Sequence, residues 1–125
     1  MAMVYRLRVV LASAAVLLLG LTVPMRVSAF DYAPINCSKA GSAAEVAVCR
    51  TYSLGQAEAR MSTLYGVATA LVAMGQRGAI ADDQVRWLSV REACGGTVSC
   101  LDEAYRNRIG ELTRILDGIV ARGPF

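Results

Sequence analysis

The sequence predicts an all-α protein, a small disulfide-stapled bundle of about four helices. Three observations carry this prediction. Apolar residues recur at intervals of three and four along several stretches, which is the period of a helix buried along one side. No stretch of convincing length alternates apolar and polar residues in the manner of a strand. The 125-residue chain also contains four cysteines, enough for two bridges.

Residues 1–29 have the pattern of a secretory signal peptide. Two arginines precede an apolar run over residues 9–23, and Val27-Ser28-Ala29 supplies small residues at the positions that a signal peptidase reads. The alternative is an uncleaved membrane anchor, which needs roughly 20 apolar residues. Because Pro24 and Arg26 end the run early, we expect cleavage after Ala29 and no stable membrane anchor afterwards.

The expected mature chain, residues 30–125, is one helical domain that is periplasmic or secreted. Lipid attachment requires a cysteine at the cleavage point, and the first cysteine is Cys37. All ten acidic residues but only ten of the 13 basic residues lie in this part, so its formal charge is near zero. No basic patch marks it, which argues against a nucleic-acid partner.

The cysteines are typical of a disulfide framework. Their number is even in a chain expected to be exported, and neither a histidine nor a Cys-x2-Cys spacing accompanies them. A zinc site is therefore not expected, and we predict no metal and no cofactor. A domain of this size buries only about two-thirds of its unfolded surface, so two bridges would contribute substantially to its stability.

Four cysteines allow three connectivities, and geometry favours one of them. On a continuous helix Cys94 and Cys100 would lie about 9 Å apart, whereas a disulfide spans no more than about 7 Å between α carbons. A bridge between them requires a helix break, which Gly95-Gly96 can provide; these glycines also fit a plain helix C-cap. Cys37 and Cys49 would then tie an extended N-terminal segment to the first helix.

The first two helices have recognisable start signals. Ser42-Ala43-Ala44-Glu45 has capping-box spacing and opens a short helix that reaches about Arg50. Ser53-Leu54-Gly55-Gln56 repeats the signal and opens a longer helix, which Gly75 and Gly78 are expected to end. The apolar stripe of that longer helix comprises Leu54, Ala57, Met61, Leu64, Tyr65, Ala68, Leu71 and Val72.

The last two helices flank the Cys94–Cys100 segment. Asp82-Asp83 is expected to cap the third helix, which runs to Cys94. As a carboxylate pair it could also do acid–base chemistry, but adjacent helical residues do not face each other, so a cap is favoured. Thr97 or Ser99 should cap the last helix, whose stripe is Leu101, Tyr105, Ile109, Leu112, Leu116 and Ile119.

Nothing in the chain predicts an enzyme. The absence of histidine excludes the serine–histidine and cysteine–histidine arrangements of nucleophilic catalysis. A serine–lysine pair is available at Ser38-Lys39, but no further residue supports it as a catalytic dyad. The chain has no glycine-rich phosphate loop, since Gly95-Gly96 is too short and stands at a helix end. We therefore predict a binding protein.

Four large polar or aromatic residues stand on two faces that the hairpin brings together. Trp87 and Arg91 are four apart on the third helix, and Tyr105 and Arg108 are three apart on the last. They could hold the hairpin, with the arginines paired to Glu45, to Glu58 or to a helix C-terminus. Alternatively, Arg91 and Arg108 could present a cation to a partner. We favour the first interpretation. It predicts a structural core that includes Trp87, Leu101, Tyr105, Leu64 and Tyr65.

These patterns together resemble the LprI-type lysozyme-inhibitor family of small secreted bacterial proteins. The resemblance rests on Gln84-x2-Trp87-Leu88-x2-Arg91-x2-Cys94-Gly95 with Cys100, Tyr105 and Arg108 after it, and on a stretch that opens at Cys37-Ser38-Lys39-Ala40. It covers nearly all of residues 30–125. It implies the same small helical fold and the same pairing, Cys37 with Cys49 and Cys94 with Cys100.

The resemblance also implies a partner, a lysozyme or another envelope protein. Lysozyme acts through two carboxylates in a cleft. The best-shaped segment to enter it is Gly95-Gly96-Thr97-Val98-Ser99, small and flanked by two cysteines. Two alternatives remain open: a periplasmic structural or protein-interaction module that binds through its second helix without inhibiting, and a thiol-redox protein that uses Cys94 and Cys100.

Overall fold

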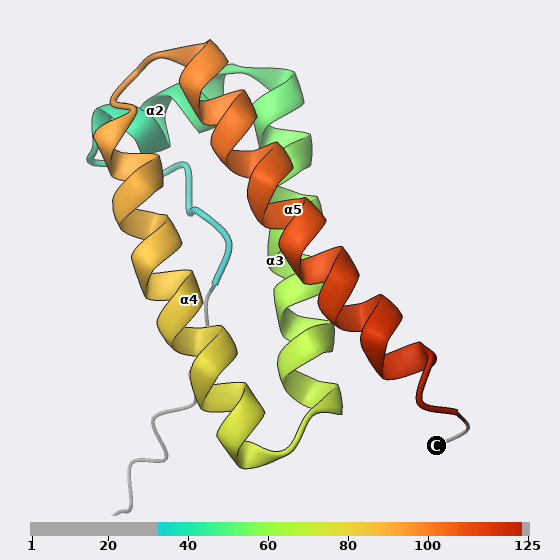
Figure 1. The fold of residues 1–125 in the computed structure, drawn as a ribbon. Coiled ribbons are helices and arrows are strands. Elements are labelled where there is room, and N and C mark those ends of the chain that lie inside the picture. The colour runs from blue at the N-terminus through green and yellow to red at the C-terminus, as the bar shows by residue number, and fades with distance from the viewer. Residues whose placement is uncertain (1–32, 124–125) are drawn as a thin grey trace, which may run out of the picture.

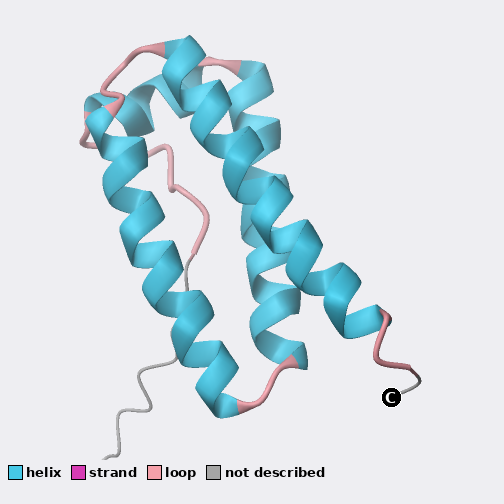
Figure 2. Ribbon diagram, in the orientation of Figure 1, coloured by secondary structure: helices cyan, strands magenta, loops and turns pink. Residues whose placement is uncertain are grey.

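The computed structural model describes residues 33–123, so the proposed signal peptide and cleavage site lie outside the described residues. Four helices follow one another: α2 (Ala43–Arg50), α3 (Tyr52–Leu71), α4 (Met74–Ala93) and α5 (Val98–Val120). Within residues 33–123 everything else is loop or turn (Figure 2). The prediction of a small all-α bundle of four helices is confirmed.

The three long helices run along one common axis (Figure 1). The short helix α2 lies at the end of the molecule where α3 and α5 begin and α4 ends. An extended arm that precedes α2 passes alongside the bundle, and its Ile35 packs against the core. One end of the bundle therefore contains α2, the segment that joins it to the arm, the first residues of α3 and α5, and the last residues of α4.

The core forms along the apolar stripes that the sequence predicts. Every helix contributes to it, and α3 and α5 form its most extensive contact. Of the predicted core residues, Trp87, Leu101, Tyr105 and Tyr65 are buried, and Leu64 is half-buried against the cluster. The largest apolar side chains that exclude solvent completely or nearly so are Leu54, Met61, Leu101, Tyr105, Leu112 and Ile119.

The start of α2 has the predicted capping box. The Ser42 hydroxyl accepts a hydrogen bond from the backbone N–H of Glu45 at 3.1 Å. The Glu45 carboxylate accepts in return from the backbone N–H groups of Ser42 at 3.3 Å and Gly41 at 2.9 Å. This local exchange satisfies donors that the first turn of a helix leaves free, and it needs no tertiary contact.

The predicted boundary between the second and third helices is wrong. α3 ends at Leu71 and α4 begins at Met74, so Gly75 and Gly78 lie inside α4 and do not end α3. Asp82 and Asp83 also lie inside α4 and cap nothing. A glycine inside a helix costs only about 1 kcal/mol, and tertiary contacts at the corner outweigh that cost.

Those contacts are visible at the corner itself. Val72 is extended, buried, and packed into the core, which turns the chain. The Arg77 side chain donates to the backbone carbonyl of Thr69 at 2.8 Å and so satisfies an acceptor near the end of α3. The other expected cap, Ser53, lies inside α3, which begins one residue earlier at Tyr52 and has no side-chain cap.

Candidate functional site

Both disulfides lie at the end of the molecule that holds α2. Cys37 pairs with Cys49 and Cys94 with Cys100, with α carbons 5.6 and 5.5 Å apart respectively. The predicted connectivity is confirmed. Gly95 allows the Cys94–Cys100 bridge to form, because its φ of +53° is a left-handed conformation that ends α4. The chain then reverses and α5 begins three residues later.

The bridged loop is shorter than expected, since α5 begins at Val98 and takes both Val98 and Ser99 into its first turn. The backbone N–H of Thr97 donates to the Cys94 carbonyl at 3.2 Å and closes the turn. Gly96, Thr97, Val98 and Ser99 are all exposed, and Val98 is 46% exposed. Thr97 is the predicted N-cap by position, although its side chain makes no capping hydrogen bond.

The loop lies close to the start of α2. An added Cβ on Gly96 would lie 3.9 Å from the Ala43 carbonyl oxygen at the start of α2. The Cys94–Cys100 bridge and the hydrogen bond of its own turn hold the loop, while its outer surface remains open to solvent.

Below the loop, aromatic packing joins α4 to α5. The Trp87 and Tyr105 rings meet edge to face, with centroids 5.1 Å apart and planes at 67°. The Trp87 indole N–H donates to the Ala104 carbonyl at 3.0 Å. The Arg91 guanidinium carbon lies 5.8 Å from the centre of the Trp87 ring, within the range of a cation–π contact. The two predicted faces do meet.

Arg91 lies at the centre of a cluster of acidic side chains. It is 5% exposed and pairs with Glu92 at 2.7 Å, and its nitrogens lie 3.9 Å from both Glu45 and Glu58. The buried Glu58 carboxylate also accepts from the Tyr105 hydroxyl at 2.7 Å. Glu45 and Glu58 are two of the three partners that the sequence offers for an arginine of this hairpin, the third being a helix C-terminus.

The cluster shifts two ionisation equilibria. Backbone hydrogen bonds from Gly41 and then Ser42, reinforced by the positive charge of Arg91, hold the pKa of Glu45 below its ordinary value. Burial, and then the hydrogen bond to the Glu58 carboxylate, raises the pKa of Tyr105 well above its ordinary range. The carboxylate of Glu45 and the neutral phenol of Tyr105 are therefore the forms that the fold favours.

Arg108 is enclosed further along the same hairpin. It is 2% exposed and donates to the Gln84 side chain at 2.9 Å, to Glu111 at 3.0 Å and to the Ile80 carbonyl at 3.3 Å. The burial of Arg91 and Arg108 favours their structural interpretation over the presentation of a cation to a partner. Gln84 is the first residue of the Gln84-x2-Trp87 pattern. Nothing in the sequence indicates that its side chain accepts a hydrogen bond from Arg108.

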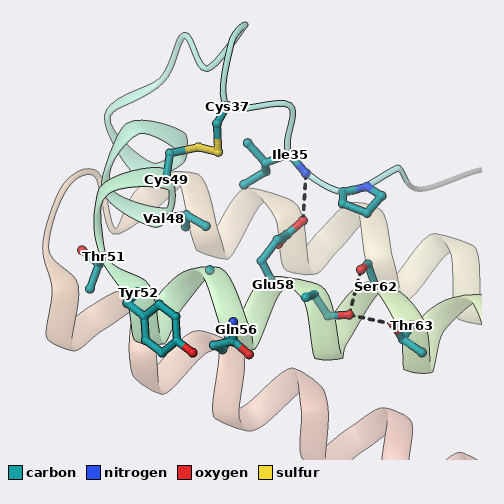
Figure 3. A pocket seen from close by; sticks show the side chains of 13 residues that line it. Ile35, Cys37, Val48, Cys49, Thr51, Tyr52, Gln56, Glu58, Ser62 and Thr63 are labelled. Carbon is teal, nitrogen blue, oxygen red and sulfur yellow. Dashed lines mark hydrogen bonds between the residues drawn. A yellow bond between two sulfur atoms is a disulfide. The ribbon is translucent and has the colours of Figure 1, made fainter.

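A groove that sequence reasoning missed lies beside the Cys37–Cys49 bridge (Figure 3). Its volume is about 440 Å³, and its walls are the arm, the end of α2 and the first three turns of α3. Tyr52 stands at its rim with 84% of its surface exposed. The one signal in the sequence is that this aromatic residue falls outside the apolar stripe of its helix.

No family model, no curated protein and no solved structure matches this chain. Across residues 33–123, no helix is both long and apolar enough to cross a bilayer, and no three His, Cys, Asp or Glu side chains gather as a set of metal ligands. The bridged loop and the groove beside Tyr52 are features of the described surface that could bind a partner.

Proposed function

We propose that this chain is an exported envelope protein that binds and blocks a lysozyme-like glycoside hydrolase through its bridged loop. The observation that carries the proposal is the exposed segment Gly96–Ser99, fixed between Cys94 and Cys100 at one end of the bundle. The resemblance to LprI-type inhibitors supplies the class of target. The two bridges fit an oxidising compartment outside the cytoplasm.

The geometry of the loop suits a cleft. A segment already fixed in its bound conformation loses little entropy when it docks, and the bridge together with the buried Trp87–Tyr105 contact holds this one. Thr97 and Ser99 place hydroxyl donors beside the exposed apolar surface of Val98. Hydroxyl groups of this kind can donate to the carboxylates that line a glycoside hydrolase cleft.

The test is an assay of cell-wall hydrolysis by lysozyme in the presence of the purified, oxidised protein. Val98→Arg places a bulky cation on the loop, and Val85→Arg makes the same change on the outer face of α4, where Val85 is 64% exposed. We expect inhibition by the wild type and by Val85→Arg, and at least a tenfold weaker inhibition by Val98→Arg. Equal inhibition by both variants would exclude the loop, and a wild type without effect would exclude the proposed target.

A second candidate function is a protein-interaction module that binds through α3 and inhibits nothing. The observation that favours it is the exposed face of α3, where Arg60 is the one charged residue among ten exposed positions of this helix. Surface helices usually present charged residues to solvent. Retention of envelope proteins on the immobilised protein, lost in Val67→Arg on α3 but kept in Val98→Arg on the loop, would favour this function over inhibition.

A further inference from the structure

The groove beside the Cys37–Cys49 bridge is separate from the loop and has preformed walls. The bridge ties the arm to α2. The backbone N–H of Ile35 donates to the Glu58 carboxylate at 3.2 Å and ties the arm to α3 (Figure 3). These two attachments hold the arm against α2 and α3 and so fix the walls of the groove. Its volume of about 440 Å³ falls in the range of small-ligand sites.

Its lining carries no charge that a ligand could reach. Of the described residues that line it, Glu58 is the one with a charge, and it is 5% exposed. Its carboxylate already accepts from Ile35 and Tyr105 and faces Arg91 at 3.9 Å. Phosphates, carboxylates and ammonium groups therefore find no counter-charge here, which leaves neutral ligands.

The accessible groups combine one aromatic ring with amide and hydroxyl groups. Tyr52 and Gln56 project from the first two turns of α3, four residues apart on one side of the helix (Figure 3). The Ser62 and Thr63 hydroxyls donate to the Ala59 carbonyl at 3.1 and 2.8 Å. Their oxygen lone pairs remain available as acceptors, and the Gln56 amide can both donate and accept.

Behind these polar groups the wall is apolar. It is formed by Ile35, Pro34, Val48 and the sulfur atoms of the Cys37–Cys49 bridge. A neutral ligand that fits must present an apolar ring face to Tyr52, several hydroxyl groups to the polar side, and a small apolar group to this wall. A pyranose ring with an acetamido substituent has all three: C–H bonds on one face, hydroxyls at its edge, and a methyl group on an amide.

We propose that this groove binds a neutral saccharide that bears acetamido groups. Tyr52 stacks on the sugar ring, Gln56 and the Thr63 hydroxyl bond its polar edge, and the acetamido methyl group rests on the apolar wall. The site does not depend on the bridged loop or on inhibition of a hydrolase. It would hold the protein on acetylated glycan while the loop remains free.

The experiment is a titration of the oxidised protein with N,N′-diacetylchitobiose, followed by amide chemical shifts in NMR spectra, with maltose as the sugar that lacks acetamido groups. We expect shifts confined to the arm and to the first three turns of α3, and weaker binding of maltose by at least tenfold. Tyr52→Ala should weaken binding at least tenfold, whereas Tyr52→Phe should retain it.

Two controls separate binding from folding. Tyr52 is exposed, so Tyr52→Ala should unfold at the wild-type temperature. Val85 lies on α4 and does not line the groove, so Val85→Ala should bind as the wild type does. The proposal is overturned if the shifts centre on residues 95–100, if maltose binds equally well, if Tyr52→Ala binds normally, or if no shift occurs.

Discussion

Replacement of Trp87 by alanine tests the hairpin that supports the loop. Trp87 is 7% exposed, its ring packs against Tyr105, and its N–H is bonded to the Ala104 carbonyl. The variant would leave a cavity between α4 and α5 and would remove the indole N–H that donates to the Ala104 carbonyl. Truncation of a buried tryptophan costs about 3–5 kcal/mol, of which the hydrogen bond accounts for about 1 kcal/mol.

Trp87→Phe separates the contribution of the aromatic ring from that of the hydrogen bond. It keeps an aromatic ring against Tyr105 and loses the N–H, so it should destabilise the protein by only about 1–2 kcal/mol. Because Trp87 is the single tryptophan, unfolding must be followed by far-ultraviolet circular dichroism during a denaturant titration. The expected order of stability is wild type, then phenylalanine, then alanine.

The opposite outcome is as informative. If Trp87→Ala unfolds within about 1 kcal/mol of the wild type but no longer inhibits lysozyme, Trp87 belongs to a binding surface and the hairpin assignment is wrong. Val85→Ala serves as the matched control, since Val85 is 64% exposed and an exposed position usually changes stability by no more than about 0.5 kcal/mol.

Three further predictions follow from the same region. Replacement of both Cys94 and Cys100 by serine should lower the free energy of unfolding by about 2–3 kcal/mol, as the chain-entropy model gives for a loop of this length; an unchanged denaturation midpoint would show that other contacts hold the loop. Arg91→Ala should cost about 3–5 kcal/mol, because it removes the buried cation beside Glu58, and a loss below 1 kcal/mol would contradict this role. The folded-state pKa of Glu45 lies below its ordinary value of 4.5, so its contribution to stability is present above about pH 4.5 and is lost as the pH falls through the folded-state pKa. Glu45→Gln should therefore flatten the acid side of the stability curve, and parallel curves for the two proteins would count against the linkage.

The features that the sequence predicts well are those with short-range causes. The capping box at Ser42 depends on a residue three positions away, and the Cys94–Cys100 bridge depends on a six-residue spacing and on a glycine that can adopt positive φ. The contact between Trp87 and Tyr105 follows from helical spacing together with the reversal at the bridged loop. In each case the chain places the interacting groups together almost by itself.

The features that it misses depend on tertiary contacts. Gly75 and Gly78 disfavour a helix locally, yet α4 includes them because the burial of Val72 fixes the corner before them. Asp82-Asp83 is consequently an ordinary part of the helix. A glycine inside a helix costs about 1 kcal/mol. The burial of one large apolar side chain stabilises the fold by more than that.

The groove could not have been predicted for the same reason. It exists because the arm docks on α3, through a hydrogen bond between residues 23 positions apart, Ile35 and Glu58. No spacing within α3 reveals that docking. Tyr52 indicates at most that an aromatic ring stands outside the core stripe.

The most direct test of the proposed function is an NMR footprint of the protein on lysozyme. The backbone N–H groups of Val98, Ser99 and Cys100 open α5 and have no acceptor within that helix, so their hydrogens should exchange rapidly in the free protein. We predict that bound lysozyme slows their exchange and leaves the amides around Val85 unchanged. Unchanged exchange in the loop, or protection confined to the exposed face of α3, would contradict the account.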